Sequence, residues 1–236
     1  MKGFKLKLFT KIIALADVVF VLSENYHKKF YQKYIDEKKL VVLENFINVK
    51  AFDHDIEFKN PNFLYVGRLS EKKGFLTLVK AVSKIKEQLQ DLKIHVLGTY
   101  ENKAFEDLCK AIIEENKINN FVFHGAVMGS EKITYFKENS VFIFPSYFEN
   151  SPIVLKEATA AKMAILAADI EENKILVQDF NNTLFFKAKD DRDLAKKILH
   201  LYHNKSLVKE FILQSQKAEI FDDKQAIKVI EKYLIH

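Results

Sequence analysis

The sequence is poor in cysteine, proline and glycine, and these shortages narrow the class of protein. Its one cysteine, Cys109, cannot form an internal disulfide, so a disulfide framework is excluded and an intracellular location is the simpler expectation. Three prolines and six glycines occur among 236 residues, without repeats or low-complexity tracts. Hydrophobic residues make up 48% of the chain, which is enough to fill a core, so a disordered protein is not expected.

Long apolar runs are also missing. No run reaches the roughly 20 residues that a membrane-spanning helix needs. The N-terminal stretch MKGFKLKLFTKIIALADVVFVLSE imitates a signal peptide, but Asp17 interrupts it and no small-residue cleavage pattern follows. We therefore expect a cytoplasmic chain, soluble or peripheral at the inner face of the membrane. Lys2, Lys5, Lys7 and Lys11 suit either a solvated helix face or contact with anionic lipid.

Several enzyme signatures are absent. The chain has no G-x-G, which argues against a Rossmann dehydrogenase, and it has no Walker A, G-x-S-x-G or H-E-x-x-H motif. His200 and His203 share a predicted helix face but lack a third ligand, so no metal site is expected. The net charge of +5 suits anionic ligands, while the dispersed basic residues do not favour nucleic-acid binding.

Six short apolar runs are typical of buried strands. They are FLYVG (63–67), KIHVLG (93–98), FVFHG (121–125), SVFIFPS (140–146), MAILAAD (163–169) and TLFF (183–186). Between them the apolar spacing becomes helical, most clearly in GFLTLVKAVSKIKEQL. Alternation of strands and helices predicts an α/β fold with a parallel, Rossmann-like sheet covered on both faces.

The chain divides into four predicted parts. Residues 1–48 form a small piece with strands at 18–23 and 40–45 around a helix near 24–34. The polar, strand-poor residues 49–61 are predicted to be a linker, and residues 62–220 the Rossmann-like domain. Residues 221–236 read as a closing helix.

Glycine placement predicts the binding face. Gly67, Gly98 and Gly125 directly follow predicted strands, and Gly74 opens a predicted helix. Ligands of open α/β sheets bind outside the carboxyl ends of the strands, where glycine lets backbone approach a ligand closely. For any single glycine, a plain strand-ending role remains an equally good interpretation.

The stretch YVGRLSEKKGF places two cations on this face. Arg68 follows a strand, and Lys73 stands at the entry to a helix. A planar guanidinium and a mobile ammonium near a helix N-terminus suit a diphosphate. Because the chain has 37 basic residues, this pattern alone carries little weight.

The stretch SYFENSPIVLKEATAAK adds two carboxylates after another strand. Ser151 is predicted to be the N-cap with Pro152 at the first helical position, so Glu149 precedes the helix and Glu157 lies about two turns beyond the cap. A carboxylate can accept two hydrogen bonds side by side, which matches the vicinal diol of a ribose or hexose. Taken alone, a solvated loop residue and a helix-surface acid explain the pair better.

Taken in order, these motifs resemble a known family. ADVVFVLSE, NFLYVGRLSEKKGF, IHVLG, FHGAV, VFIFPSYFENSPIVLKEA and NNTLFF follow one another as in the retaining glycosyltransferases of the GT-B group often called family 4. The resemblance covers nearly the whole chain. It implies two Rossmann-like domains facing a cleft, the second of which binds a UDP- or GDP-sugar, with no metal or other cofactor.

The resemblance also assigns roles to residues. Arg68 and Lys73 match the diphosphate-binding pair, Glu149 and Glu157 match an E-x7-E signature that contacts the transferred sugar and the ribose, and Val127 matches the loop whose backbone reads the base. Catalysis is expected to depend on Glu149, Arg68 and Lys73. The implied donor-binding set is Gly67, Arg68, Lys73, Val127, Glu149, Ser151, Ile153, Val154 and Glu157.

The chain also departs from the family pattern. ADVVFVLSE resembles the last part of the first, acceptor-binding domain, so residues 1–48 are expected to be a remnant of that domain. A truncated product, one half of a split enzyme and a fragment all remain open. Lys162 stands where glycine is usual in the family, and Glu171 and Glu172, in place of a glycine pair, would bring negative charge towards a diphosphate.

Two functions from different classes follow. The first is a hexosyltransferase, or its donor-binding half, that acts on a glycan or lipid-linked acceptor in surface polysaccharide or lipopolysaccharide synthesis. The alternative is a catalytically inactive nucleotide-binding or scaffold module. The expected partners are a nucleotide-sugar, the acceptor, a membrane surface and a separate chain that supplies the N-terminal domain, and nucleic acid is not among them.

Overall fold

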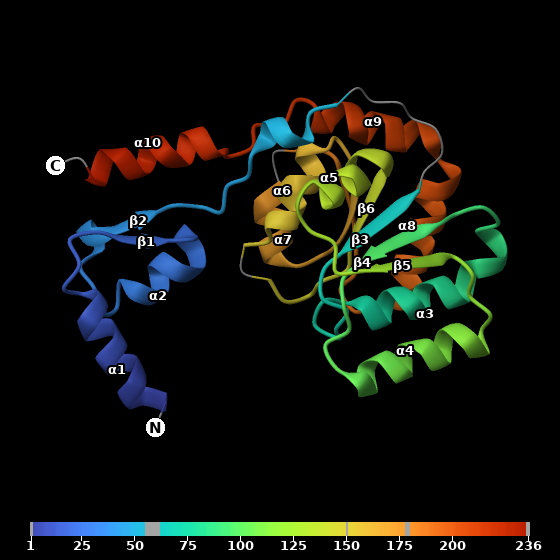
Figure 1. Ribbon diagram of the computed structural model, residues 1–236, viewed down its shortest axis with the longest axis horizontal. Coiled ribbons are helices and arrows are strands. Elements are labelled where there is room, and N and C mark those ends of the chain that lie inside the picture. The colour runs from blue at the N-terminus through green and yellow to red at the C-terminus, as the bar shows by residue number, and fades with distance from the viewer. Residues whose placement is uncertain (1, 55–61, 150, 178–179, 235–236) are drawn as a thin grey trace. The chain divides into compact units, whose positions relative to one another are not determined.

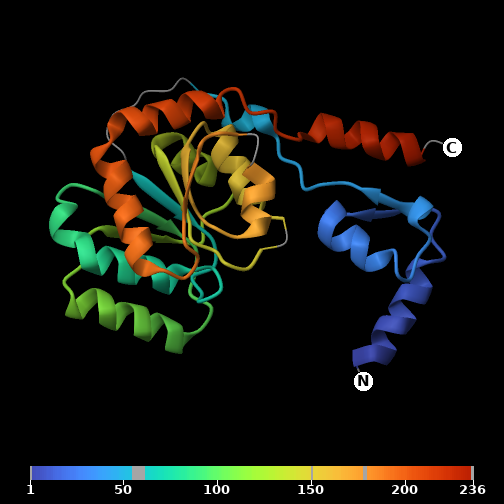
Figure 2. The same cartoon turned by 180° about the vertical axis from the view of Figure 1, so that it is seen from behind.

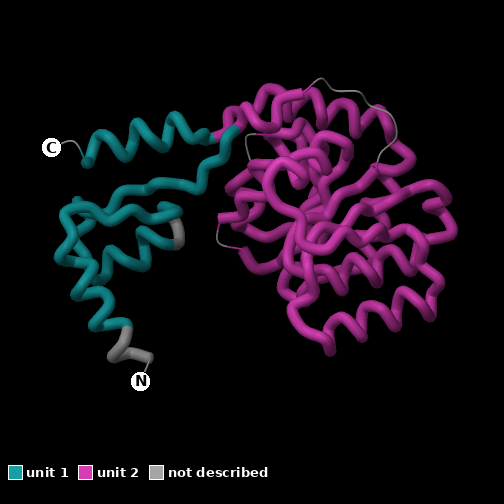
Figure 3. The backbone as a smooth tube through the Cα atoms, in the orientation of Figure 1, with its two compact units in different colours: residues 1–48, 221–236 teal, residues 49–220 magenta. Residues whose placement is uncertain are grey.

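A computed structural model describes residues 2–54, 62–149, 151–177 and 180–234. The chain forms two compact units, shown in different colours in Figure 3. Unit 1 comprises residues 1–48 and 221–236, and unit 2 comprises residues 49–220. The terminal segment 221–236 is thus grouped with the N-terminal segment, and the first part of the predicted linker is grouped with unit 2. Among the described residues, no helix is both long and apolar enough to span a bilayer.

Unit 2 is built on a six-stranded parallel sheet (Figure 1). In spatial order its strands are β5 (Phe121–Gly125), β4 (Ile94–Leu97), β3 (Phe63–Val66), β6 (Val141–Phe144), β7 (Ala164–Ala168) and β8 (Thr183–Phe186). All six strands predicted from the sequence are confirmed, with ends that differ by no more than two residues. The α/β class and the parallel sheet are therefore confirmed.

The direction of strand addition reverses between β3 and β6. From β3 the sheet grows through β4 to β5 on one side, and from β6 through β7 to β8 on the other. Phe63 of β3 consequently pairs with Ile94 of β4 and with Val141 of β6. Such a reversal separates the loops that follow the two central strands and opens a crevice at their carboxyl ends.

Helices cover both faces of this sheet, as Figures 1 and 2 show. They are α3 (Phe75–Ile85), the short 3-10 helix η4 (Lys86–Gln88), α4 (Lys103–Glu115), α5 (Gly129–Glu138), α6 (Ile153–Ala160), α7 (Glu171–Val177), α8 (Asp191–His203) and α9 (Lys205–Ser215). The apolar face predicted for GFLTLVKAVSKIKEQL is buried, with Leu78, Val79 and Val82 at 0% exposure.

The two faces have separate cores because alternate residues of a strand point to opposite sides. On one side, Phe63 and Ile143 pack in a large cluster with α3, α4, α8 and α9. On the other, the ring of Phe142 lies 5.7 Å from that of Phe136 of α5 in a tilted arrangement, and Phe136 meets the ring of Phe52 edge-on at 5.8 Å.

The segment predicted to be a linker begins with a 3-10 helix, η3 (Val49–Phe52), which packs against α5 and α6. Residues 55–61 lie outside the described part of the chain. Lys162 fastens the end of this segment, because its ammonium lies 3.1 Å from Asp53 Oδ1 and donates to the His54 carbonyl at 2.6 Å. Lys162 itself has φ 59°, the left-handed conformation that favours glycine.

A buried asparagine amide links the start of β8 to α6 and α9. Asn182, with 0% exposure, precedes β8 and donates to Ser215 Oγ at 2.7 Å and to Thr159 Oγ1 at 3.3 Å. Ser215 in turn donates to the Met163 carbonyl at 2.8 Å. Asn181 takes φ 50°, so it supplies the positive φ that glycine would otherwise provide at this turn.

Two histidines share a hydrogen bond within the sheet. His95 of β4 and His124 of β5 stack 5.2 Å apart, with 2.9 Å between His95 Nδ1 and His124 Nε2, and Tyr135 of α5 lies 2.9 Å from His124 Nδ1. Burial lowers the pKa of His95, and the neighbouring His124 lowers it further, while Glu138 acts in the opposite direction.

Unit 1 is much smaller. Its elements are α1 (Lys2–Ile13), β1 (Val19–Val21), the π-helical turn η1 (Glu24–Lys28), α2 (Lys29–Tyr31), the 3-10 helix η2 (Glu37–Lys39), β2 (Leu40–Val42) and α10 (Asp223–Leu234). β1 and β2 form a parallel pair. The core consists of Val21, Ile35 and Leu40, and Phe20 packs edge-on against Tyr233 of α10.

Candidate functional site

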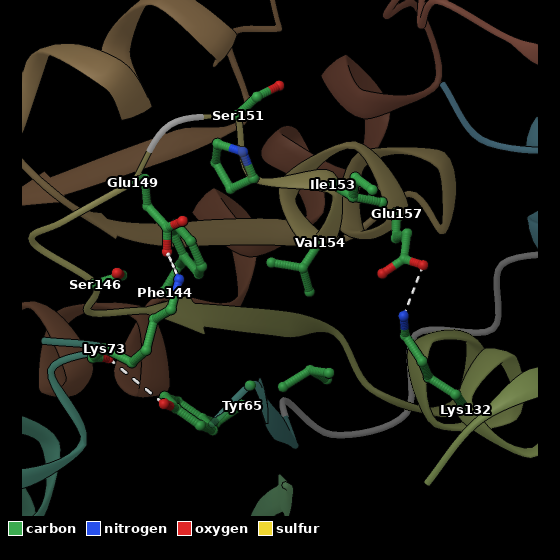
Figure 4. Close-up of a pocket in the computed structure, with 13 residues that line it drawn as sticks. Tyr65, Lys73, Lys132, Phe144, Ser146, Glu149, Ser151, Ile153, Val154 and Glu157 are labelled. Atoms are coloured by element: carbon green, nitrogen blue, oxygen red, sulfur yellow. Dashed lines mark hydrogen bonds and ion pairs between the residues drawn. The ribbon is translucent and has the colours of Figure 1, made fainter. Parts of the chain in front are cut away.

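A pocket of about 490 Å³ opens at the carboxyl ends of β3 and β6, where the strand order reverses. It lies within unit 2. Its lining residues are Tyr65, Val66, Gly67, Lys73, Lys132, Phe144, Ser146, Glu149, Ser151, Pro152, Ile153, Val154 and Glu157. Figure 4 shows that these side chains come from β3 and β6, from the loops that follow these two strands, and from α5 and α6. This is the face that the glycine placement predicts.

The loops beyond β3 and β4 pack backbone against backbone. Gly67 N donates to the Leu97 carbonyl at 2.9 Å, and Gly98 N donates to the Gly125 carbonyl at 2.6 Å. A Cβ atom on Gly98 would lie 1.9 Å from the Gly67 carbonyl oxygen, and Gly98 has φ 148°. Only glycine fits there, and the contact holds the Gly67 loop at the edge of the pocket.

The β3 loop ends in direct contact with the β6 loop. Gly74 is the N-cap of α3 with φ 70°, and a Cβ atom there would lie 2.0 Å from the Pro145 carbonyl oxygen. This close approach places Lys73, the preceding residue, beside the segment that carries Glu149. A loop bearing a cation and a loop bearing an acid are thus brought together by glycine.

Tyr65 supports the loop that follows β3 through its hydroxyl group. Its hydroxyl donates to the Arg68 carbonyl at 2.9 Å and lies 3.5 Å from the Lys73 carbonyl. Burial raises the pKa of Tyr65, and the charge of Glu149 adds to the increase. The hydroxyl therefore stays protonated near neutral pH and continues to donate.

The β6 loop is anchored on both sides. Ser146, 1% exposed, places its hydroxyl 3.4 Å from the Lys72 carbonyl, and Tyr147 N donates to the same carbonyl at 3.2 Å. The buried Asn173 side chain of α7 lies within 3.4 Å of the Ser146 carbonyl. These contacts fix the start of the segment that leads to Glu149.

Lys73 and Glu149 form an ion pair inside the pocket. Lys73 Nζ lies 2.6 Å from Glu149 Oε1 (Figure 4). The Glu149 side chain is only 8% exposed, while that of Lys73 is 37% exposed. A carboxylate so far removed from water requires a charged partner, and Lys73 supplies it without becoming inaccessible itself.

The helix after the loop begins one residue later than predicted. Pro152 occupies the N-cap position with φ −74° and ψ 104°, and α6 starts at Ile153, so the assignment of Ser151 as N-cap is wrong. Proline fixes φ near −65°, which is compatible with either position, and here the extended ψ keeps it outside the helix. Ile153, Val154 and Glu157 follow along α6 and line the pocket.

A second ion pair lies at the Glu157 end of the pocket. Lys132 Nζ, from α5, lies 2.7 Å from Glu157 Oε1, with side-chain exposures of 25% and 12%. The other oxygen, Glu157 Oε2, is buried and has no hydrogen-bond partner among the described residues. Two carboxylates therefore face one pocket, each held by one lysine.

Most residues of the predicted donor-binding set are brought together, and two are not. Gly67, Lys73, Glu149, Ser151, Ile153, Val154 and Glu157 all line the pocket. Arg68 is exposed and is not part of the lining, although its carbonyl accepts from Tyr65. Val127 is half-buried in the loop between β5 and α5 and is also outside the lining.

Among the described lining residues, three with polar side chains were not predicted from the sequence. Lys132, Tyr65 and Ser146 line the pocket but were not predicted. Lys132 follows the strand end FHGAV by a few residues, so its proximity to the binding face was the available signal. Glu171 and Glu172, which the sequence placed near a diphosphate, stand exposed in the first turn of α7 and are not among the lining residues.

The charges of the lining favour a ligand with both anionic and hydroxyl groups. Lysine ammonium groups bind phosphate oxygens, and carboxylates accept hydrogen bonds from hydroxyl groups. Within the described parts of the chain, no three His, Cys, Asp or Glu side chains come close enough together to hold a metal ion.

The sequence pattern of the family described as "Glycosyl transferases group 1" matches residues 46–218. The chain belongs to this family. The match includes the pocket and every strand of the unit 2 sheet, and it confirms the resemblance to GT-B glycosyltransferases.

Relatives of known name are similar over most of the chain. The Staphylococcus aureus capsular polysaccharide biosynthesis glycosyltransferase CapM is 25% identical over 226 residues, which is 87% of this chain and 58% of CapM. A Campylobacter jejuni N-acetylgalactosamine-N,N'-diacetylbacillosaminyl-diphospho-undecaprenol 4-alpha-N-acetylgalactosaminyltransferase is 26% identical over 236 residues, which is 93% of this chain and 60% of that protein. The chain thus spans about three fifths of the length of these relatives.

The fold of this glycosyltransferase family member also matches solved structures. The crystal structure of Anabaena HepE in complex with UDP aligns with a TM-score of 0.81, at 15% identity, over 97% of this chain and 68% of that chain. At this identity the likeness concerns the fold alone.

Proposed function

We propose that the chain binds a UDP- or GDP-linked sugar in the pocket between β3 and β6. It transfers a hexose-type sugar, with retention, to a glycan or lipid-linked acceptor in surface polysaccharide or lipopolysaccharide synthesis. The observation that carries the proposal is the Lys73–Glu149 ion pair at the strand-order reversal, 2.6 Å long, in the same pocket as Glu157. Membership in the glycosyl transferases group 1 supports it.

When the donor binds, Lys73 and Glu149 separate and each contacts a part of the donor. The leaving diphosphate competes with Glu149 for Lys73, which is the more exposed member of the pair. Once released, the Glu149 carboxylate can accept hydrogen bonds from sugar hydroxyls, and Arg68 can turn its exposed guanidinium towards the diphosphate. As the bond between the sugar C1 atom and the diphosphate oxygen breaks, the acceptor hydroxyl oxygen forms a new bond to C1 on the same face, and its proton passes to the leaving diphosphate. The cations stabilise the negative charge that develops on the diphosphate, and Glu149 orients the sugar. Neither carboxylate acts as a nucleophile.

Calorimetric titration with UDP, GDP and ADP tests donor binding. We expect micromolar binding of UDP or GDP, and a loss of about tenfold or more in Lys73→Ala, since a hydrogen bond between charged groups is removed. Lys80→Ala is the matched control, because Lys80 lies exposed on α3 and outside the pocket. Absence of binding to all three nucleotides would refute the proposal.

Metal independence is part of the proposal and has its own test. With an acceptor and the candidate partner chain present, release of UDP or GDP from the corresponding nucleotide-hexose should proceed at the same rate with and without EDTA. A rate abolished by EDTA and restored by Mg²⁺ would contradict this part while leaving donor binding intact.

We propose two further partners. One is a separate chain that supplies an acceptor-side domain, and the other is an anionic membrane surface that α1 contacts through its lysines. Sedimentation with vesicles that contain anionic lipid tests the membrane contact, and binding that does not weaken with added salt would count against it.

Stable co-purification with the product of an adjacent coding frame tests the partner chain, and sugar transfer by this chain alone would refute it.

A second candidate function is a non-catalytic nucleotide-binding module. The exposed position of Arg68, outside the pocket lining, favours it, because the predicted diphosphate-binding pair is only half assembled. Nucleotide binding without turnover of any nucleotide-hexose, with acceptor and candidate partner chain present, would favour this candidate over the first.

A further inference from the structure

Lys132 was not part of any predicted motif, yet it makes one of the two ion pairs of the pocket. It lies on α5, while its partner Glu157 lies on α6. In Figure 4 the two side chains reach towards each other, and the second carboxylate oxygen of Glu157 is turned away from Lys132. The pair is therefore a bridge between two helices across one end of the pocket.

The surroundings make this bridge more than a surface ion pair. The Glu157 side chain is 12% exposed and that of Lys132 is 25% exposed, so neither is fully solvated. Glu157 Oε2 is buried without a hydrogen-bond partner among the described residues. Leaving a buried carboxylate oxygen without a partner is energetically costly, and the contact between Lys132 and the other oxygen, Oε1, holds this carboxylate in place.

Lys132 is itself restrained. Its ammonium lies 5.8 Å from the centre of the Phe136 ring, one turn further along α5, and Phe136 is fully buried. Lysine on a free surface loses much side-chain entropy when it is ordered. Here the aromatic face and the carboxylate together limit the ammonium to the Glu157 end of the pocket.

We propose that Lys132 is a positioning residue for the nucleoside. It holds the Glu157 carboxylate in the orientation that accepts hydrogen bonds from the vicinal hydroxyls of a ribose, and it does not bind the diphosphate. This inference rests on the proposed function of the pocket. The division of labour follows from the placement: Lys73 pairs with Glu149 and Lys132 pairs with Glu157.

The test compares UDP with 2′,3′-dideoxy-UDP, which keeps the diphosphate but lacks the vicinal hydroxyls. We expect Lys132→Met to weaken UDP binding about tenfold, in line with a lost charged hydrogen bond, and to leave the weaker binding of dideoxy-UDP nearly unchanged. Lys132→Arg, which keeps the cation, should restore UDP binding to within about threefold of the natural chain. Lys137→Met is the matched control, on the same helix but outside the pocket.

The outcomes separate this inference from the function on which it rests. If the unmodified chain binds no nucleotide, the proposed function fails and the inference fails with it. If the unmodified chain binds UDP and Lys132→Met binds it equally well, only the inference fails. An equal loss for UDP and dideoxy-UDP in Lys132→Met would show that Lys132 contacts the diphosphate, which also overturns the inference. Circular dichroism melting confirms that each variant is folded, and the arginine variant provides the readout if the methionine variant is not.

Discussion

The two units bury their apolar residues to very different extents. In unit 2 a continuous cluster runs from Phe63 on β3 to Ile212 on α9 and covers one whole face of the sheet. In unit 1 the core is Val21, Ile35 and Leu40, next to two strands of three residues each. A two-stranded sheet with so small a core is marginal on its own. Stability and the pocket are therefore both concentrated in unit 2.

The contrast is also seen between α1 of unit 1 and the central strand of unit 2. Along α1 and just beyond it, Leu8, Ile12 and Leu15 are exposed by 53%, 59% and 83%. In unit 2 the central strand β6 is buried throughout. Changes in unit 2 should therefore affect the stability of the fold and of the site together, while changes in unit 1 should leave the site intact.

The largest effect is expected from Gly98→Ala in unit 2. The added methyl group would meet the Gly67 carbonyl oxygen at 1.9 Å, so the two loops must separate. We expect a loss of at least roughly 3 kcal/mol in the free energy of unfolding, by overpacking and backbone strain together, measured by denaturant unfolding with circular dichroism.

Gly125→Ala is the control for this substitution. Gly125 also has positive φ, at 71°, but no atom lies within 4 Å of its added Cβ. Only the backbone strain remains, about 1 to 2 kcal/mol. Equal losses in the two variants would show that close backbone packing does not hold this edge of unit 2.

The second effect is expected from Asn182→Ala, also in unit 2. Its removal leaves the buried Thr159 hydroxyl without this donor and breaks the bond to Ser215. We expect the free energy of unfolding to fall by about 2 kcal/mol, because buried polar partners lose their hydrogen bonds. A loss below about 0.5 kcal/mol, measured by the same denaturant unfolding, would mean that water replaces the amide.

A third substitution, Leu40→Ala, moves the test to unit 1. Leu40 is 5% exposed and is one of three core residues there, so we expect unit 1 to lose about 2 kcal/mol of stability. Hydrogen exchange measured by mass spectrometry should speed up in residues 1–48 and remain unchanged in the pocket segments. Nucleotide affinity should also be unchanged, and a marked loss of affinity would show that the two units do not behave independently.

The smallest effect is a pH dependence that originates in unit 2. The pKa of His95 lies below its ordinary value of 6.5, first because of burial and then because of His124. As the pH falls through 6.5, the unfolded chain takes up a proton before the folded chain does, so stability falls towards pH 5. His95→Gln should reduce this fall, measured as the free energy of unfolding between pH 7 and pH 5. An unchanged slope would assign the dependence to other groups.

Local sequence patterns were sufficient to predict the scaffold. Short apolar runs located all six strands of unit 2, because the inner strands of a parallel sheet are buried on both faces. The edge strands β5 and β8 are apolar as well, although they are only partly buried. The glycines after β3 and β4 predicted the binding face, because Gly67 and Gly98 meet in a contact that permits no side chain. The separation of Glu149 and Glu157 along a loop and a helix likewise followed from one short segment.

Contacts between distant segments could not be predicted in the same way. Lys132 reaches Glu157 only because α5 and α6 lie beside each other, and no local pattern distinguishes it from the many other basic residues. Arg68 follows β3 and Val127 follows β5, as predicted, but both lie outside the lining, since the direction of a loop side chain depends on tertiary contacts. The start of α6 was also missed by one residue, because Pro152 and not Ser151 occupies its N-cap position.

Lys162 has a consequence for how this chain can change in evolution. Its backbone conformation favours glycine, but its ammonium binds Asp53 and the His54 carbonyl. Replacement of Lys162 by glycine would relieve the backbone strain and remove the contacts to Asp53 and His54 in the same step. The two effects oppose each other, so the lysine is entrenched by a partner more than a hundred positions away in the chain, and the residues at 53 and 162 are expected to change together.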